Sequence, residues 1–301
     1  MQFVENTEVL IIKWLQSFSN PFLDNFFIFI SLFGSIYFAI IVLSYLYTFN
    51  NKENAFKFFI GFICSVLFVT TIKIAINRLR PYEKFPFDIR LIGKPETSAS
   101  FPSGHSQTAG YIYTYLLINV FKKIWPKIIF GLIFALVIIS RMYLGVHYLS
   151  DILVGSMIGI CLFFITDKIL KKVTINILIV SLWLAVISFV VIIIISILCF
   201  NTLLSWETSA EILISTSIIF GFAFGIILEK VIVNDLSINN KKGAKMNFLF
   251  SNFIFFLSYI LLNNYLIIHP LINGLIFFAY GFYITFITPL LKKIFLRSFP
   301  H

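Results

Sequence analysis

The sequence predicts an all-α fold, a polytopic bundle of about nine transmembrane helices. Of its 301 residues, 59% are hydrophobic and only 12% are charged, whereas charged residues make up about 25% of a soluble globular protein. The mean hydropathy is +0.98. Apolar runs recur along the whole chain between short polar links, and a run of about 20 such residues is enough to cross a bilayer. We therefore expect an integral membrane protein.

The first 33 residues are expected to lie on the membrane surface. The apolar stretch Val9–Phe18 is interrupted by Lys13 and Gln16 and followed by Ser-Asn-Pro, so it is too short to span the bilayer. An amphipathic helix of this kind lies in the interface. The first crossing then begins at residue 34, or as early as Phe22, and ends near residue 49.

Eight further crossings are expected along the chain. They cover residues 56–76, 104–121, 127–143, 147–167, 174–200, 208–229, 247–267 and 270–291. A polar segment, residues 77–103, separates the second crossing from the third and cannot lie in lipid. Because nine crossings is an odd number, the two termini are expected on opposite sides of the membrane.

Basic residues indicate the orientation. Fifteen Lys and Arg residues fall on one side of the predicted bundle, and the positive-inside rule makes that side cytoplasmic. They are Lys52, Lys57, Lys122, Lys123, Lys127, Lys168, Lys171, Lys172, Lys230, Lys241, Lys242, Lys245, Lys292, Lys293 and Arg297. The amino terminus is then outside. The remaining eight Lys and Arg residues lie on the outer face: Lys13, Lys73, Arg78, Arg80, Lys84, Arg90, Lys94 and Arg141. An anionic ligand explains such a basic cluster on the outer face better than sorting does.

The first of three polar motifs runs from Lys73 to Pro81 at the end of the second predicted span. Seven residues are nearly two helical turns, so Lys73 and Arg80 can point the same way, and Pro81 stops further regular helix. Two cations on one stripe at the membrane surface suit a phosphate group. The alternative is that both side chains snorkel to lipid headgroups.

The second motif, Phe101-Pro102-Ser103-Gly104-His105, opens the third predicted span. A helix amino terminus offers backbone N–H groups and a positive dipole end to an anion, and Gly104 allows a close approach. His105 is expected at the edge of that anion site. The alternative role of Ser103 is a helix N-cap.

The third motif joins the fourth and fifth predicted spans, where Arg141 ends one and His147 and Asp151 begin the other. Spacing i, i+4 places His147 and Asp151 on one helix face. The carboxylate can then accept a hydrogen bond from one imidazole nitrogen and hold the other, unprotonated, toward a substrate. A carboxylate just inside a span is costly unless it is paired. The alternative is a structural His–Asp pair that bridges helices.

In this order the three motifs closely resemble the signature of the type-2 phosphatidic acid phosphatase family, the lipid phosphate phosphatases. The resemblance covers residues 56–169 and implies a nucleophilic His147 that forms a phosphohistidine, an Asp151 that orients it and a general acid, His105. It also implies that the phosphoryl oxygens are held by Lys73, Arg80, Ser103, Gly104 and Arg141.

The resemblance also implies a domain organisation. A six-helix catalytic phosphatase core occupies residues 34–173, with its sixth span ending near residue 200, and residues 201–301 add further spans of unassigned role. Small-xxx-small patterns at Gly155/Gly159 and Gly221/Gly225 allow close helix packing; the alternative is that they are ordinary membrane glycines, and neither pattern establishes a dimer. Glu229 is expected to be solvated on the cytoplasmic side.

We expect a metal-independent phosphatase of a lipid phosphate or diphosphate, with no cofactor, because no cluster of Asp and Glu accompanies the motifs. The protein is expected in the plasma (inner) membrane, with its active site on the extracytoplasmic side and no nucleic-acid partner. The motifs do not distinguish phosphatidate, phosphatidylglycerophosphate, an isoprenoid diphosphate or a lipid A phosphate. Two alternatives are a phosphatase of a soluble sugar phosphate and a non-catalytic protein that binds or transports anionic lipids. The sequence does not predict an oligomeric state.

Overall fold

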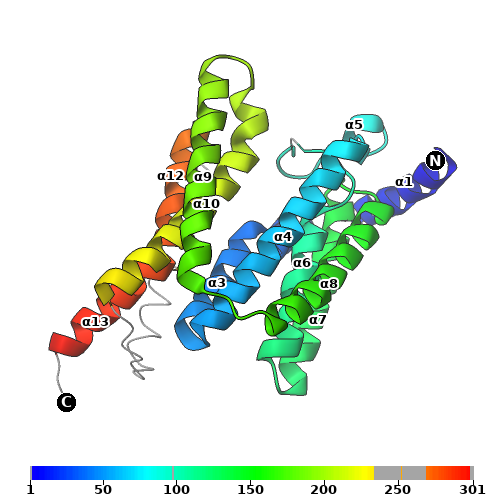
Figure 1. The fold of residues 1–301 in the computed structure, drawn as a ribbon. Coiled ribbons are helices and arrows are strands. Elements are labelled where there is room, and N and C mark those ends of the chain that lie inside the picture. The colour runs from blue at the N-terminus through cyan, green and yellow to red at the C-terminus, as the bar shows by residue number, and fades with distance from the viewer. Residues whose placement is uncertain (1, 97, 234–251, 253–268, 299–301) are drawn as a thin grey trace. The chain divides into compact units, whose positions relative to one another are not determined.

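The computed structural model describes residues 2–96, 98–233, 252 and 269–298, and within these ranges every regular element is a helix (Figure 1). The expected all-α class is therefore confirmed. The chain forms two compact units. Unit 1 comprises Met1–Leu43 and Lys57–Val173, and unit 2 comprises Ser44–Phe56 and Thr174–His301.

The helices that build unit 1 come from the amino-terminal part of the chain, and α3 and α4 continue across its boundary into unit 2. In chain order they are α1 (Gln2–Gln16), α2 (Pro21–Ser31), the 3₁₀ turn η1 (Leu32–Gly34), α3 (Ile36–Phe49), α4 (Lys52–Ile76), α5 (Pro81–Lys84), α6 (Gly104–Tyr115), the π-helical turn η2 (Leu116–Val120), α7 (Ile124–Tyr143) and α8 (Leu149–Lys172).

Six helices within the described ranges are long and apolar enough to cross a membrane. They are Lys52–Lys84, Ile124–Tyr143, Leu149–Lys172, Ile177–Phe200, Ile212–Val233 and Pro270–Leu291, and they coincide with six of the predicted crossings. The pair Pro21–Gly34 and Ile36–Phe49 forms one further span if its two parts, bent by 49°, cross together. This arrangement agrees with a first crossing that begins as early as Phe22.

Two predicted crossings have a different outcome. The predicted crossing at 104–121 corresponds to α6 followed by η2. Helix α6 alone is too short to be one of the six membrane-crossing candidates. The crossing at 247–267 lies outside the described residues. The expected number of about nine spans therefore stays a prediction.

Helix α6 lies in the interior of unit 1 and carries His105 at its first turn. Ser103 is its N-cap, with the hydroxyl oxygen accepting from the backbone N of Ser106 at 3.3 Å. Helix α8 packs against α6 through two glycines: a Cβ on Gly155 would lie 2.5 Å from the carbonyl oxygen of Ser103, and one on Gly159 would lie 2.1 Å from that of Gln107. The expected close packing at this glycine pair is confirmed, and it fixes α6 directly against α8.

Helix α1 docks on the end of unit 1 where α5 also lies (Figure 1). Its Val9 and Ile12 are buried in a cluster with Met142, Tyr148 and Ile152. Polar contacts add to this apolar docking. Lys13 forms an ion pair with Asp88 at 2.7 Å, and the Gln16 side chain bonds the backbone N and O of Arg90 and the carbonyl of Tyr143. The amino-terminal helix is thus a packed part of unit 1.

Unit 2 contains most of the remaining helices. They are α9 (Ile177–Phe200), α10 (Trp206–Leu228), the π-helical turn η3 (Glu229–Val233), α12 (Pro270–Phe282), the π-helical turn η4 (Tyr283–Ile287) and α13 (Thr288–Ser298). Gly221 and Gly225 let α10 approach the α12–η4 segment, because a Cβ at Gly221 would lie 2.0 Å from the carbonyl oxygen of Phe278 and one at Gly225 2.0 Å from the Thr285 hydroxyl. Close packing at this second pair is also confirmed.

The expectation that Glu229 is solvated is wrong. Its side chain is 8% exposed, accepts a hydrogen bond from the Tyr47 hydroxyl at 2.6 Å and forms an ion pair with Lys52. The two partners come from α3 and α4, which are distant in the sequence, and they compensate the burial of the charge.

Candidate active site

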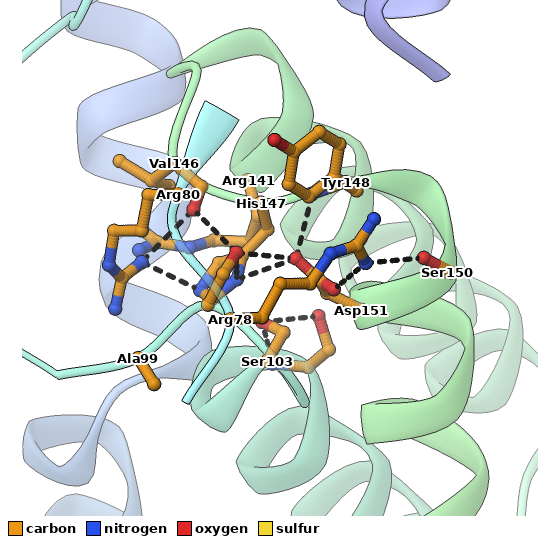
Figure 2. A network of polar contacts seen from close by, with 12 residues as sticks. Arg78, Arg80, Ala99, Ser103, Arg141, Val146, His147, Tyr148, Ser150 and Asp151 are labelled. Atoms are coloured by element: carbon orange, nitrogen blue, oxygen red, sulfur yellow. Dashed lines mark hydrogen bonds and ion pairs between the residues drawn. The ribbon is translucent and has the colours of Figure 1, made fainter. Parts of the chain in front are cut away.

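Four segments of unit 1 meet at one end of its helices. The chain that follows α4 supplies Arg78 and Arg80, the start of α6 supplies His105, the end of α7 supplies Arg141, and the start of α8 supplies Asp151. His147 lies in the short link between α7 and α8. Figure 2 shows the network of polar contacts that joins most of these side chains.

A tight link turns the chain from α7 into α8 and places His147. The carbonyl of Arg141 accepts hydrogen bonds from the backbone N of both Val146 and His147 at 3.2 Å. Gly145 has φ +76°, in the left-handed region that favours glycine, and a Cβ there would lie 2.5 Å from the carbonyl oxygen of Arg90. The link therefore needs glycine at this position to bring His147 to the end of α8.

The contacts of His147 define the state of its imidazole. Nε2 lies 3.2 Å from Nη1 of Arg80, and a guanidinium can only donate, so Nε2 is the unprotonated acceptor. The proton of the neutral ring is then on Nδ1, 3.5 Å from Oδ2 of Asp151. Burial, together with the charge of Arg80, lowers the pKa of His147 to about 4 although Asp151 opposes this shift. The ring is therefore neutral at neutral pH.

Asp151 is fully buried and uses both carboxylate oxygens. Oδ2, the oxygen that faces His147, also accepts from the Ser100 hydroxyl at 2.5 Å and from the backbone N of Tyr148 at 2.9 Å. Oδ1 accepts from Nη1 of Arg78 at 2.6 Å. These bonds fix the carboxylate at the first turn of α8, where the helix dipole also favours negative charge.

Two buried guanidiniums lie in front of His147, and both contact the same carboxylate. Arg80 is 0% and Arg141 3% exposed. Nη2 of Arg80 lies 2.8 Å from Oε2 of Glu96, and Nη2 of Arg141 contacts Oε1. Both histidines are close as well: Nε2 of His147 lies 3.8 Å from Oε2, and Nδ1 of His105 lies 3.9 Å from Oε1.

Glu96 is therefore an anion that two guanidiniums bind and that two imidazoles face. Burial raises the pKa of its carboxyl, but the positive charge of Arg141 and the other basic groups outweighs this and holds the pKa well below its usual range. Arg141 retains a buried donor, Nε, for which the described part of the chain provides no acceptor. The arrangement is a site for an oxyanion placed directly against an imidazole lone pair.

The remaining predicted residues lie around this site in different ways. The side chain of Lys73 bonds the carbonyl of Ala99 and lies against Gly104, where a Cβ would be 3.8 Å from Lys73 Cε. The Ser103 hydroxyl is used within the first turn of α6, where it accepts from Ser106. Arg80 and Arg141 thus bind one anion that both histidines face, whereas Ser103 and Gly104 lie at the start of α6, next to His105 in the chain. Lys73 is linked to Arg80 through the hydroxyl of Ser98.

Sequence reasoning missed four residues of the network, namely Glu8, Arg78, Glu96 and Ser100. The sequence places Arg78 in the basic cluster of the outer face but assigns it no role in the site. Glu96 follows a proline in a polar loop, and nothing in its immediate sequence distinguishes it from a solvated carboxylate. Glu8 belongs to a helix expected only at the membrane surface.

The fold and the site define a helical membrane protein with an oxyanion site beside a paired, neutral histidine. A family model described as "PAP2 superfamily" matches residues 54–175. Undecaprenyl-diphosphatase from Sulfolobus acidocaldarius is 30% identical over 149 residues, which are 49% of this chain and 70% of that protein. The chain therefore belongs to the PAP2 superfamily, as the three motifs indicate.

Two further relatives are similar over parts of the chain. Phosphatidylglycerophosphatase B from Bacillus subtilis is 41% identical over 86 residues, which are 26% of this chain and 42% of that protein. The crystal structure of a transmembrane PAP2-type phosphatidylglycerolphosphate phosphatase from Bacillus subtilis matches with a TM-score of 0.50 and 28% identity. That match covers 58% of this chain and 90% of the other.

Proposed function

We propose that this protein hydrolyses a lipid phosphate or diphosphate through a phosphohistidine on His147, without a metal ion. One observation carries the proposal: the unprotonated Nε2 of His147 faces a carboxylate that two buried guanidiniums also bind. A phosphoryl group, like a carboxylate, is an anion that offers a fork of oxygens to an arginine. Its phosphorus would then lie in front of the nucleophile.

The reaction begins with an exchange of anions. The phosphoryl group of the substrate displaces the carboxylate of Glu96, and Arg80 and Arg141 bind its oxygens, with Nε of Arg141 as an additional donor. In this proposal Lys73, which is linked to Arg80 through Ser98, supplies further positive charge, and the backbone N–H of Gly104 donates a hydrogen bond to the phosphoryl group. Fixed donors that are already in place stabilise the charge of the transition state without reorganisation.

The chemical step forms one bond and breaks another. Nε2 of His147 attacks phosphorus while the bond from phosphorus to the leaving oxygen breaks, and His105 donates a proton to that oxygen. The Nδ1 proton remains on the ring, where Asp151 stabilises the positive charge of the phosphorylated imidazole. Water then attacks phosphorus with His105 as the base, which releases inorganic phosphate and restores His147.

The substrate class follows from the membrane setting and the names of the relatives. One relative is named as a phosphatidylglycerophosphatase and another as an undecaprenyl-diphosphatase, so both monoesters and diphosphates belong in the test. The site lies at the ends of apolar helices, which supports a substrate whose phosphate is in the headgroup region. By the positive-inside rule this end is extracytoplasmic, at the outer leaflet of the plasma membrane.

The experiment is release of inorganic phosphate by purified protein from phosphatidate, phosphatidylglycerophosphate and isoprenoid diphosphates. We expect His147→Ala to lose activity by at least about 10⁴-fold and His105→Ala by about 10²–10⁴-fold. A chelator should leave the wild-type rate unchanged. Phosphate release by His147→Ala at the wild-type rate, or activity that a chelator abolishes and magnesium restores, would refute the mechanism.

A further inference from the structure

The amino-terminal helix α1 reaches the active site through one buried carboxylate. Glu8 is 5% exposed, and burying a charge is costly unless it is paired and hydrogen-bonded. Its Oε2 lies 3.2 Å from Nη2 of Arg78, and its Oε1 accepts from the backbone N of Ser150 at 2.5 Å. Ser150 belongs to the first turn of α8, so Glu8 also caps that helix from outside.

Arg78 connects Glu8 with the catalytic pair. Its Nη1 donates to Oδ1 of Asp151 at 2.6 Å and to the hydroxyl of Ser150 at 2.8 Å (Figure 2). The guanidinium carbon also lies 3.9 Å from the centre of the Tyr148 ring. One guanidinium is thus shared between a carboxylate of α1 and a carboxylate of α8.

Sharing the cation affects the charge that His147 experiences. A guanidinium bound to Asp151 alone would draw the negative charge of that carboxylate toward Oδ1, away from the imidazole. Glu8 on the other edge of the guanidinium opposes this attraction and leaves more charge on Oδ2, the oxygen 3.5 Å from Nδ1 of His147. Low local dielectric in the buried site strengthens each of these interactions.

We propose that Glu8 is a positioning residue of the active site, which sets the orientation and effective charge of Asp151 behind His147 through Arg78. Its effect on turnover rests on the proposed phosphatase function, whereas its effect on the His147 imidazole does not. Helix α1 is then a component of the site and not only a surface anchor.

A purely structural role for Glu8 makes a different prediction, because α1 has other anchors. Val9 and Ile12 are buried, and the Lys13–Asp88 ion pair and the Gln16 bonds hold the helix at its other end. Glu8→Gln keeps the size of the side chain and an acceptor for Ser150 but removes the charge. Lys13→Gln is the matched control, since it removes an exposed ion pair from the same helix.

The first test observes His147 without turnover. The chain has four histidines, so ¹⁵N-histidine spectra of the full-length protein in detergent can be assigned with His147→Gln. We expect the Nδ1-bound proton of His147 to move upfield in Glu8→Gln, as its hydrogen bond to Asp151 weakens, and to be unchanged in Lys13→Gln. A His147 signal unchanged by Glu8→Gln would overturn the proposal.

The second test measures phosphate release. Glu8→Gln should lower kcat by about tenfold, by analogy with the loss of a hydrogen-bond partner behind a metal-ligating side chain. KM and the thermal midpoint should stay close to wild type. On an Arg78→Gln background the same substitution should add less than about twofold, because coupled residues are not additive. Multiplicative effects, or a loss of kcat matched by a loss of folded protein, would contradict the proposal. If Glu8→Gln shifts the His147 signal but the wild-type protein releases no phosphate, the result counts against the phosphatase function alone.

Discussion

At the residue scale, the position of Glu96 is the most consequential feature of the site. Its carboxylate binds the groups that we propose for the phosphoryl oxygens, so the protein carries its own competitor for the substrate. The competitor is one residue on a loop, and substrate binding has to displace it. Affinity for any phosphate-like ligand is therefore reduced by the stability of the Glu96 contacts with Arg80 and Arg141.

This competition predicts the effect of Glu96→Gln on inhibition. The neutral amide binds guanidiniums more weakly than a carboxylate, so we expect inhibition constants for orthovanadate and inorganic phosphate to fall by about tenfold or more. Asp88→Asn removes a negative charge from the same loop region, where Asp88 is an exposed partner of Lys13, and should leave both constants nearly unchanged. Equal effects of the two substitutions would mean that only the overall charge matters.

The pH dependence of the same comparison has a definite sign. A carboxyl group with a lowered pKa competes as an anion above that pKa and loses its charge only as the pH falls through it. The basic groups hold the pKa of Glu96 well below its usual value despite burial. The ratio of the inhibition constants of wild type and Glu96→Gln should therefore stay constant between about pH 5.5 and pH 8. A ratio that rises or falls within this range would show that another group titrates in the competition.

The sequence could identify those site residues whose interaction partners are close to them in the chain. His147 and Asp151 are four residues apart at the start of one helix, so their pairing follows from helical spacing. Glu96 and Glu8 act on side chains from other segments, and the contacts of such residues follow only from the tertiary structure. Glu229 is a similar case in unit 2, since its partners Tyr47 and Lys52 are far away in the chain.

At the element scale, the crossing of α6 and α8 aligns the two histidines. His105 is on the first turn of α6, and His147 is two residues before α8, so the distance between the two helices sets the distance between the proposed general acid and the proposed nucleophile. The glycines of α8 make this crossing close, because the backbone of α6 occupies the space that side chains would need. The sequence predicted close packing at these glycines, but the helix that they contact could not be inferred from one chain.

This packing predicts the effect of adding a single methyl group. Gly159→Ala would place a Cβ within 2.1 Å of the carbonyl oxygen of Gln107, so α6 or α8 has to move. We expect a loss of stability of about 1–3 kcal/mol, the usual cost of overpacking, with reduced activity because the histidines separate. Thermal unfolding in detergent measures the first and phosphate release the second.

Gly131→Ala is the control for this prediction, because a Cβ on Gly131 in α7 would meet no atom of the described residues within 4 Å. Alanine favours helix over glycine by up to about 1 kcal/mol, so Gly131→Ala should be neutral or stabilising. A Gly159→Ala protein as stable as Gly131→Ala would show that the two helices are not in the tight contact described.

At the scale of the whole molecule, hydropathy located most crossings because a bilayer imposes a minimum length on apolar helices. It did not predict the bend of 49° between the two parts of the first crossing, Pro21–Gly34 and Ile36–Phe49, because hydropathy reports the length of an apolar stretch and not its direction. The family match ends at residue 175, close to the boundary between the two units at Val173 and Thr174. Unit 2 therefore contains most of what this chain adds to the matched region.

Orientation in the membrane is the last property that the charges predict. The end of unit 1 that carries the site is rich in cations, but these have partners: Arg78 contacts Glu8 and Asp151, Arg80 and Arg141 contact Glu96, and Arg90 contacts Asp24. Under the proposed function, binding of an anionic substrate and stabilisation of the site account for these cations. The opposite end keeps Lys122, Lys123, Lys168, Lys171 and Lys172, a bias that the positive-inside rule assigns to the cytoplasm.

Single cysteines in a background without Cys64, Cys161 and Cys199 test this orientation in intact cells. Phe87→Cys lies at the site end, where the native side chain is fully exposed, and Lys123→Cys lies in the exposed link before α7 at the opposite end. We expect a membrane-impermeant maleimide to label Phe87→Cys directly and Lys123→Cys only after permeabilisation. The reverse pattern would place the site in the cytoplasm, and the substrate would then have to be a phosphate presented by the inner leaflet. Under the proposed function, phosphate release by both variants is the control for folding. The site is built from residues of α6, α7 and α8, so a misfolded protein would be inactive.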